Sequence, residues 1–322
     1  MRMAGRTSLI LFLSLMSVCF TVHAAGDYPS RPIRLILSSP PGGAVDLVAR
    51  TLAKKISESL QQQVIVDNRP GGGQIIGTDI AAKAEPDGYT LLVISITHTI
   101  NPGLGLRLPY DSERDFSPIS MLATSPLVLV VHPSTRVKTT GELIALAKSK
   151  PGQLNFAGSN ASGGHLAMEL LLDMTGTKMM HVPYNGATPA LIDLIAGRVQ
   201  VMMTSPLAAG PHIMSGKLSV IGVSSRARQG SMPRVPAIAE TVPGYEASLW
   251  YGLLAPKGLA GRLISRLNAV TQRALASEDV RSFFESRGVM PEGSTPEEFS
   301  GFIRTEIDKW RKVIQSAGIK RG

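Results

Sequence analysis

The sequence predicts a two-lobed α/β protein. Its 322 residues exceed one average domain, and 43% of them are hydrophobic, which is enough to build a large core. Short apolar runs alternate with amphipathic stretches, and this alternation occurs in two separate units that share a helical C-terminal segment. Strands that alternate with helices are typical of parallel sheets covered on both faces, so we expect a parallel sheet in each lobe.

The first 24 residues have the features of a secretory signal peptide. Arg2 and Arg6 form a short basic start, residues 7–22 are apolar, and Val22-His23-Ala24 places small residues at the two positions that a signal peptidase recognises. We therefore predict export, with cleavage after Ala24. A buried N-terminal helix is the alternative, but the segment is not amphipathic.

One cysteine occurs in the sequence, Cys19, and it lies in this expected signal peptide. A lipoprotein anchored through Cys19 is a weaker alternative, because Met16-Ser17-Val18 lacks the small residue expected before a lipidated cysteine. Without Cys19 the exported chain has no disulfide framework and no thiol nucleophile. After this segment no apolar run approaches the ~20 residues needed to cross a bilayer, so an integral membrane protein is not expected.

The first alternating unit has the order strand, helix, strand, helix, strand. Its opening strand, at 33–38, ends at the turn Pro40-Pro41-Gly42-Gly43. Apolar residues then recur every four positions from Val48 to Leu60, which predicts an amphipathic helix. The remaining expected elements are a strand at 63–67, a helix at 75–84 and a strand at 89–96, followed by an irregular stretch at 102–118.

The second unit repeats the alternation. Thr188 and Pro189 are expected to be the N-cap and the first position of a helix, where proline is tolerated. The other elements are strands at 127–131, 154–157, 178–182, 199–204 and 218–223, and helices at 141–148, 166–174 and 208–214. A proline-rich connection at 232–243 leads to a strand at 250–254 and to helices at 259–277, 278–287 and 296–317.

Six loops follow strands and should meet where ligands bind in parallel α/β folds. They are rich in Gly, Ser, Thr and Asn and contain no Lys or Arg, so an anion there would be held by helix-terminal amides and hydroxyls. A single such loop is more simply a tight strand-to-helix turn, and the prediction depends on all six. The loops lie at 39–46, 71–78, 95–102, 158–165, 184–188 and 204–206.

Three ionisable side chains in these loops are candidates for ligand contact. Asp46, at a helix start, either stabilises the first turn or holds a ligand amine or amide. His98 and His165 either donate a hydrogen bond to a carboxylate or serve as a solvated residue or cap partner. The histidines that we expect to be structural are His132, His181 and His212.

Signatures of enzymes, metal sites and nucleic-acid binding are missing from the sequence. Ile76 stands where a dinucleotide motif starting at Gly71 needs its third glycine, and Asn160-Ala161 before Ser162 does not form a nucleophile elbow. The histidines form no His-x-x-x-His pair. The net charge of +9 is dispersed, with no basic run interleaved with aromatic residues. We expect no cofactor, no metal and no nucleic-acid partner.

Seven short motifs occur in order along the mature chain: Tyr28-Pro29-Ser30-Arg31-Pro32-Ile33-Arg34, Pro41-Gly42-Gly43 with 46–50, Asn68-Arg69-Pro70-Gly71, Pro86-Asp87-Gly88-Tyr89-Thr90-Leu91-Leu92, His181-Val182-Pro183-Tyr184, Pro189-Ala190-Leu191 and Gly252-Leu253-Leu254-Ala255-Pro256. With these motifs the chain resembles the Bug-type, TctC-like periplasmic solute receptors of tripartite tricarboxylate transporters. The resemblance implies an α/β fold of the type II periplasmic binding protein kind, with a ligand cleft between two lobes.

The resemblance also implies how the chain is divided and what it does. Lobe 1 is expected to contain 25–124 and 250–322, and lobe 2 to contain 125–249, with hinge crossings near 123–127 and 246–252. The lobes would close around a small carboxylate or related polar metabolite, and a membrane permease would recognise the closed form. We expect a periplasmic monomer that is not an enzyme and whose partners are this solute and the permease subunits.

Carried over motif by motif, the resemblance implies ligand contacts from both lobes. Two departures from the family's pattern affect the choice of ligand. Asn185 stands where Lys is frequent, and Val45 stands where a hydroxyl residue is common. Both favour a monocarboxylate, an amide or an aromatic acid over a highly charged di- or tricarboxylate. The expected contacts are Pro41, Gly42, Gly43, Asp46, Thr97, His98, Ser159, Ser162, His165, Tyr184, Gly186 and Ser205.

Two other functions remain open. A periplasmic sensor subunit that presents the ligand to a signalling partner would have the same sequence features, because the discriminating surface belongs to the partner. An exported enzyme on the same scaffold would need a thiol, a metal or a catalytic triad, which the sequence lacks. Neighbouring genes for a large and a small membrane subunit would favour transport, and a sensor-kinase gene would favour signalling.

Overall fold

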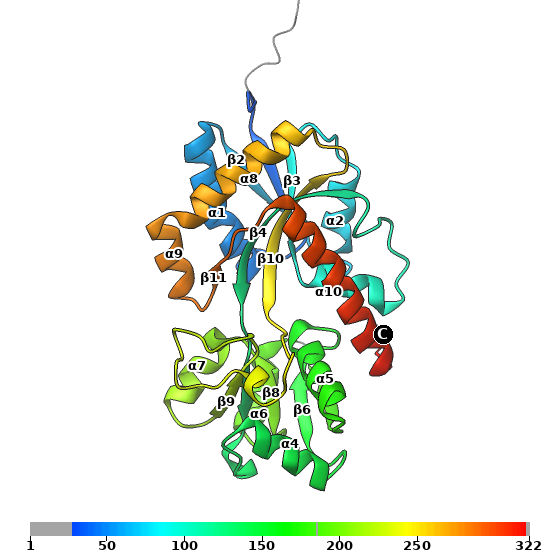
Figure 1. Cartoon of the computed structure of the whole chain (residues 1–322), viewed down its shortest axis with the longest axis vertical. Helices are drawn as coiled ribbons and strands as arrows, with labels where there is room; N and C mark the ends of the chain where they lie inside the picture. The colour runs from blue at the N-terminus through cyan, green and yellow to red at the C-terminus, as the bar shows by residue number, and fades with distance from the viewer. Residues whose placement is uncertain (1–27, 185, 320–322) are drawn as a thin grey trace, which may run out of the picture.

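The computed structural model of the protein describes residues 28–184 and 186–319. Two β-sheets, one above the other, form two lobes with helices on the sheet faces (Figure 1). The predicted two-lobed α/β fold is therefore confirmed. The expected signal peptide, its cleavage site and Cys19 lie outside the described residues. Within those residues, no helix combines the length and the apolar character needed to span a membrane.

The first sheet has the strand order β11-β4-β10-β3-β1-β2. In its parallel half, β1 (Ile33–Leu37) pairs with β2 (Val64–Asn68) and β3 (Thr90–Ser95). Helices α1 (Ala44–Leu60) and α2 (Ile75–Ala82) form the crossovers. This half confirms the predicted alternation of the first unit, and the apolar residues of α1 are buried as its four-residue spacing indicates.

The other half of this sheet shows that the prediction of parallel strands was wrong. β10 (Leu249–Pro256) runs antiparallel to β3 and to β4 (Phe116–Ser125), and the short β11 (Met290–Pro291) runs antiparallel to β4. β4 also begins inside the stretch that we expected to be irregular. We did not predict this strand because Pro118 lies within it, and proline has no N–H to donate to a neighbouring strand. The pairing of β4 with β10 changes register next to Pro118.

The second sheet has the order β7-β6-β8-β5-β9 and is also mixed. β6 (Asn155–Gly158) is parallel to β7 (Met180–Pro183) and β8 (Val201–Thr204), whereas β5 (Val128–Val131) is antiparallel to β8 and β9 (Ser219–Val223). Its helices are α4 (Thr140–Ser149), α5 (Gly163–Thr175), α6 (Ala187–Ile195) and α7 (Pro206–Met214). α6 begins before the predicted cap Thr188, because Gly186, at φ +108°, is the N-cap.

Two connections join the sheets. β4 continues into β5 through Pro126 and Leu127, and the segment 224–248 leads from β9 back to β10. Since β4 leaves the first sheet toward the second and β10 returns from it, these two neighbouring strands must run in opposite directions. The local alternation of strands and helices does not contain this information, which is why the mixed sheets were not predicted.

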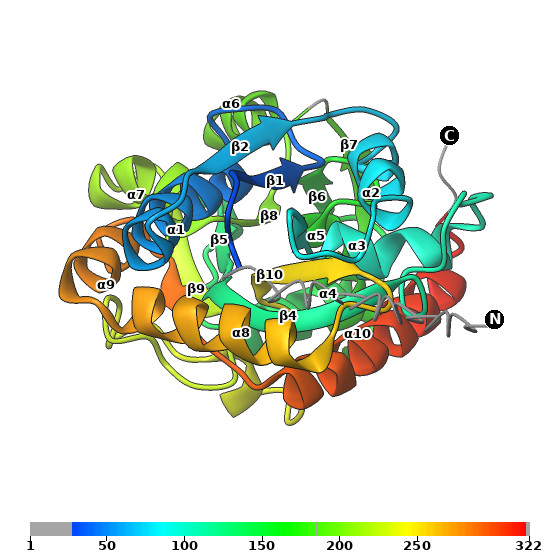
Figure 2. The ribbon, with the colours of Figure 1, turned by 90° about the horizontal axis from the view of Figure 1, so that it is seen from above.

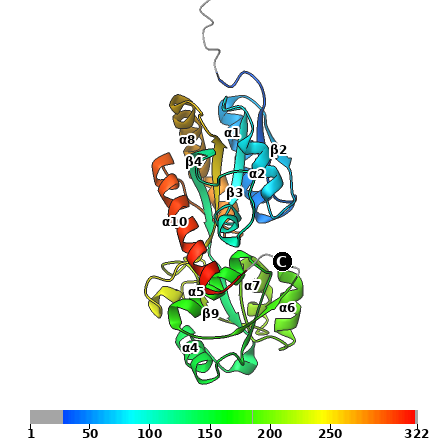
Figure 3. The same cartoon turned by 90° about the vertical axis from the view of Figure 1, so that its right-hand side faces the viewer.

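The C-terminal helices pack on the first sheet. α8 (Gly261–Ala276) and α10 (Pro296–Ser316) pack on β4, and α9 (Glu278–Glu285) lies between them in the chain (Figure 2). α10 also reaches α5 of the other lobe (Figure 3). Buried side chains form one continuous cluster through this contact, including Trp310 of α10 and Leu166 of α5. Short helical segments complete the fold: α3 (Thr97–Ile100), η1 (Asn101–Leu104), η2 (Pro133–Thr135) and η3 (Ile238–Glu240).

Candidate ligand-binding loops

Asp46 organises the loop that follows β1. Its Oδ2 accepts hydrogen bonds from the Gly42 amide at 3.0 Å and from Arg50 Nε at 2.9 Å, and its Oδ1 accepts one from Asn68 Nδ2 at 3.0 Å. Burial raises the pKa of this carboxyl, but the hydrogen bonds outweigh burial and hold the pKa below its usual value. The Asp46 carboxylate therefore stabilises the loop through hydrogen bonds and is itself buried, while residues 41–43 are exposed.

The segment after β3 separates two residues that we expected to act together. Thr97 is half-buried, whereas His98 is 2% exposed and its Nε2 lies 2.8 Å from the carbonyl oxygen of Ser112. The His98 ring packs against Tyr110 and Phe116, and burial lowers its pKa to about 4. His98 is a neutral core histidine rather than an exposed contact, because neighbouring residues of a helix point in different directions.

The loops after β6 and β7 are joined by hydrogen bonds. The Gly186 amide donates to Ser159 Oγ at 3.0 Å, and the Tyr184 amide donates to the carbonyl oxygen of Gly158 at 3.0 Å. The Tyr184 hydroxyl is not free, because it donates to Asp193 Oδ2 of α6 at 2.8 Å. These predicted residues therefore form one connected unit beside the first turn of α6, with Tyr184 as a support.

Ser162 and His165 hold the N-terminus of α5. Ser162 Oγ accepts a hydrogen bond from the His165 amide at 3.2 Å. The His165 ring is 2% exposed; its Nδ1 accepts from the Ala161 amide at 3.0 Å, and its Nε2 lies 3.3 Å from Glu169 Oε1. We did not predict Glu169, although its i, i+4 spacing from His165 was a usable signal. His181 stacks on His165 with ring centroids 3.7 Å apart, a contact that no local pattern indicated.

The two lobes meet at the N-terminus of α5. A Cβ built on Gly163 would collide with Leu249, which opens β10, and would contact Ile96, which precedes Thr97. The loops after β3 and β6 are therefore brought together. On α7, the half-buried Ser205 is the N-cap, and its Oγ accepts from the Ala208 amide at 3.3 Å.

Open space borders these loops, and two of the helices that follow them begin at a glycine. A Cβ built on Gly42, Gly43 or Gly186 meets no atom of the described residues within 4 Å. The N-caps of α1 and α6 are Gly43 and Gly186, which have no side chain that could bond the first N–H groups of their helices. Amides at helix starts bind anions through hydrogen bonds and the helix dipole. The arrangement suits a small anion without requiring a Lys or Arg.

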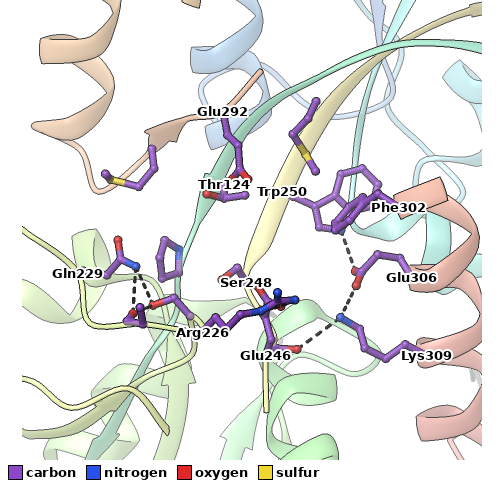
Figure 4. A pocket seen from close by; sticks show the side chains of 15 residues that line it. Thr124, Arg226, Gln229, Glu246, Ser248, Trp250, Glu292, Phe302, Glu306 and Lys309 are labelled. Atoms are coloured by element: carbon purple, nitrogen blue, oxygen red, sulfur yellow. Dashed lines mark hydrogen bonds and ion pairs between the residues drawn. The ribbon is translucent and has the colours of Figure 1, made fainter. Parts of the chain in front are cut away.

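A separate cavity of about 550 Å³ lies against the connections between the lobes (Figure 4). Its walls come from β4, the segment 225–229, the start of β10 and α10. Figure 4 shows Arg226 beside Glu246, whose Oε2 lies 2.7 Å from Arg226 Nη2, and Lys309 beside Glu306. The residues that we expected to contact the ligand do not line this cavity, which was not predicted from the sequence.

Glu306 is a buried carboxylate in the wall of this cavity. Its Oε2 accepts hydrogen bonds from Trp250 Nε1 at 2.9 Å and from Trp310 Nε1 at 2.8 Å, and its Oε1 pairs with Lys309. Trp250 belongs to β10 and Trp310 to α10. This carboxylate therefore ties β10 to α10, the helix that also contacts α5.

Comparison with known proteins decides the family. The model of the tripartite tricarboxylate transporter family receptor, TctC, matches residues 48–319. The chain belongs to this family. Protein BugT of Bordetella pertussis is 39% identical over 315 residues, covering 96% of each chain. A UPF0065 protein in the tcbD-tcbE intergenic region of Pseudomonas sp. strain P51 is 41% identical over 315 residues, covering 96% of this chain and 94% of that one.

Solved structures of similar proteins agree with the family. The structure of R. palustris Rpa4515 with adipate has a TM-score of 0.77 and 33% identity, covering 91% of this chain and 99% of that one. MatC from Rhodopseudomonas palustris with bound malate has a TM-score of 0.73 and 28% identity, covering 89% of this chain and 100% of that one. This TctC-family receptor is thus a periplasmic solute-binding protein with a two-lobed, type II-like fold.

Proposed function

We propose that this receptor captures a small carboxylate between its lobes and delivers it to the membrane subunits of a tripartite tricarboxylate-type permease. The observation that carries the proposal is the set of loops at helix N-termini in both lobes, which offer amides and hydroxyls to an anion and contain no Lys or Arg. The bound adipate and malate of the similar structures support a carboxylate ligand.

The proposed direct contacts are the loop residues that are exposed or half-buried and whose side chains are not already committed to a charged partner. Asp46, His165 and Tyr184 hold these loops in place, and His98 belongs to the core. The direct contacts are Pro41, Gly42, Gly43, Thr97, Ser159, Ser162, Gly186 and Ser205.

In the same proposal the receptor is exported, cleaved after Ala24 and active as a monomer. Lobe 1 comprises 25–124 and 250–322, and lobe 2 comprises 125–249. Closure takes place about the crossings near 123–127 and 246–252, and contacts that form only in the closed state drive it. Small-angle scattering of the mature chain should then show a smaller radius of gyration with ligand than without it.

Calorimetric titration of the mature chain, 25–322, with adipate, malate and the neutral analogue adipamide tests the ligand class. Ser162→Ala should weaken carboxylate binding at least tenfold, about 1.4 kcal/mol, because it removes a hydroxyl and loosens α5. Thr139→Ala is the matched control, since Thr139 is the N-cap of α4 and lies outside the six loops. Equal losses in both variants, or equal binding of adipamide, would contradict the proposal.

The partner is tested in cells. In the native host, deletion of the receptor gene should abolish uptake of the carboxylate that the calorimetry identifies, and the gene carried on a plasmid should restore it. Unchanged uptake together with a lost transcriptional response to the same carboxylate would instead favour the sensor function.

A further inference from the structure

Beneath the loop after β6 lies a stack of two histidines that the proposed function does not explain. His165 of α5 and His181 of β7 lie with ring centroids 3.7 Å apart and planes 14° from parallel. Phe156 of β6 packs against both rings, at 5.8 Å from His165 and 5.0 Å from His181. Each histidine also bonds to the backbone of the segment 158–161, which lies in the proposed ligand-binding loop.

The hydrogen-bond partners assign the protons of both rings. His165 Nδ1 accepts from the Ala161 amide at 3.0 Å, so its proton is on Nε2, which faces Glu169 Oε1 at 3.3 Å. His181 Nε2 lies 3.0 Å from the carbonyl oxygen of Gly158, and a carbonyl only accepts, so this nitrogen carries the proton. The His165 imidazole is therefore neutral in this arrangement, whereas the Nε2–H of His181 is present in both the neutral and the protonated form of that ring.

A further proton is incompatible with the same arrangement. On His165 it can only bind Nδ1, where it would face the Ala161 N–H and replace an acceptor with a second donor. Ala161 has φ +55°, a left-handed conformation that costs energy for a residue with a side chain and persists only when its surroundings hold it. On His181 the proton would place a charge against the ring of His165.

We propose that His181 and Glu169 are positioning residues for the ligand-binding loop, which they hold in place through His165 only while both imidazoles of the stack are neutral. The proposal rests on the proposed function, because it assigns the segment 158–162 to ligand binding. It predicts that acid weakens ligand binding by rearranging this loop, without any protonation of the ligand.

The groups around the stack set the direction of the effect. Burial, followed by the neighbouring His165, lowers the pKa of His181, while Glu169 acts in the opposite direction. β6 and β8 present apolar side chains and backbone to this region. Glu169 also lines a cavity with two exposed charged residues, Asp173 and Lys178, which solvent screens. From α10, the polar contact is that of Ser316 with Asp173.

Two substitutions each replace one protonatable ring of the stack and keep its hydrogen bond to the segment 158–161. In His165→Asn the amide oxygen replaces Nδ1 as the acceptor for Ala161. In His181→Gln the amide nitrogen replaces Nε2 as the donor to Gly158. His132→Gln is the matched control, because His132 is held by Ser134 at the end of β5 and takes no part in the stack.

Adipate affinity is measured by calorimetry from pH 8 to pH 5, each variant being compared with its own value at pH 8. Adipate itself gains protons near pH 5, so the ratio between a variant and the parent at the same pH is the readout. A coupled proton weakens binding by up to about tenfold per pH unit. The parent and His132→Gln should lose affinity more steeply than His165→Asn and His181→Gln, and identical pH profiles in all four would overturn the proposal.

A second measurement does not need the ligand. In the apo protein, the amide resonance of Ala161 should shift with the same pH midpoint as the ring carbons of His181. An Ala161 resonance that stays constant while the His181 ring titrates would overturn the proposal. If adipate fails to bind at any pH, a dicarboxylate ligand loses its support, while the pH dependence of the Ala161 resonance still decides the role of the histidine stack.

Discussion

The buried carboxylate of Glu306 provides a direct test of how α10 is held against β10. It accepts hydrogen bonds from both Trp250 and Trp310. An N–H group left without a partner in the interior costs about 1–3 kcal/mol, and Glu306→Ala removes the acceptor of two. We therefore expect the free energy of unfolding to fall by about 2–6 kcal/mol. Glu306→Gln keeps an acceptor oxygen and should lose about half as much.

Tryptophan fluorescence reports on this site alone, because Trp250 and Trp310 are the two tryptophans of the sequence. Equilibrium unfolding in urea, followed by this emission and by circular dichroism, gives the free energy for each variant. Asp308→Ala is the control on the same helix, since the Asp308 side chain is 65% exposed and an exposed ion pair contributes at most about 1 kcal/mol. If Glu306→Ala loses no more stability than Asp308→Ala, Glu306 is not the acceptor that stabilises both indoles.

Acid should weaken the fold through His98, whose pKa is about 4 in the native state and about 6.5 in an unfolded chain. The unfolded chain binds more protons between these values, so the free energy of unfolding should fall by about 3 kcal/mol from pH 6.5 to pH 4. Urea unfolding at both pH values measures this fall, which should be smaller in His98→Gln than in the parent. Gly252→Ala would push a methyl group into the buried Phe299 ring, and urea unfolding followed by circular dichroism should show a loss of about 1–3 kcal/mol in stability. Tyr245→Phe removes a buried hydroxyl that donates to a backbone carbonyl of α5 at 2.9 Å; we expect about 1 kcal/mol less stability in urea and unchanged adipate affinity.

Most elements of the fold could be predicted because their signals are local. The four-residue spacing from Val48 to Leu60 describes the buried face of α1, and α10 begins at the predicted Pro296. β4 was missed because Pro118 interrupts its pattern, and the start of α6 was misplaced because Gly186 caps the helix before Thr188. These errors arise where backbone geometry in the folded chain, rather than side-chain pattern, sets the boundary.

The loops of the candidate site were also accessible from the sequence, but the roles of their residues were not. Glycine, serine and helix-cap patterns mark the segments after β1, β6, β7 and β8 as strand-to-helix turns. Whether an ionisable residue in such a turn faces outward depends on what packs against it. His98 was expected to be a contact and is a core residue, and His165 is buried on His181, which is distant in the chain.

The sequence alone determined the two alternating α/β units, the absence of basic residues from the loops and the motifs of the TctC family. Periodicity, turn residues and contiguous motifs are properties of neighbouring residues, so they can be recognised in the sequence without the folded structure. Only the tertiary structure decided the direction of β10, the burial of Glu306 between two tryptophans and the stacking of His165 on His181. Each of these depends on segments far apart in the chain, and their contacts are chosen by packing, burial and hydrogen-bond satisfaction in the whole molecule.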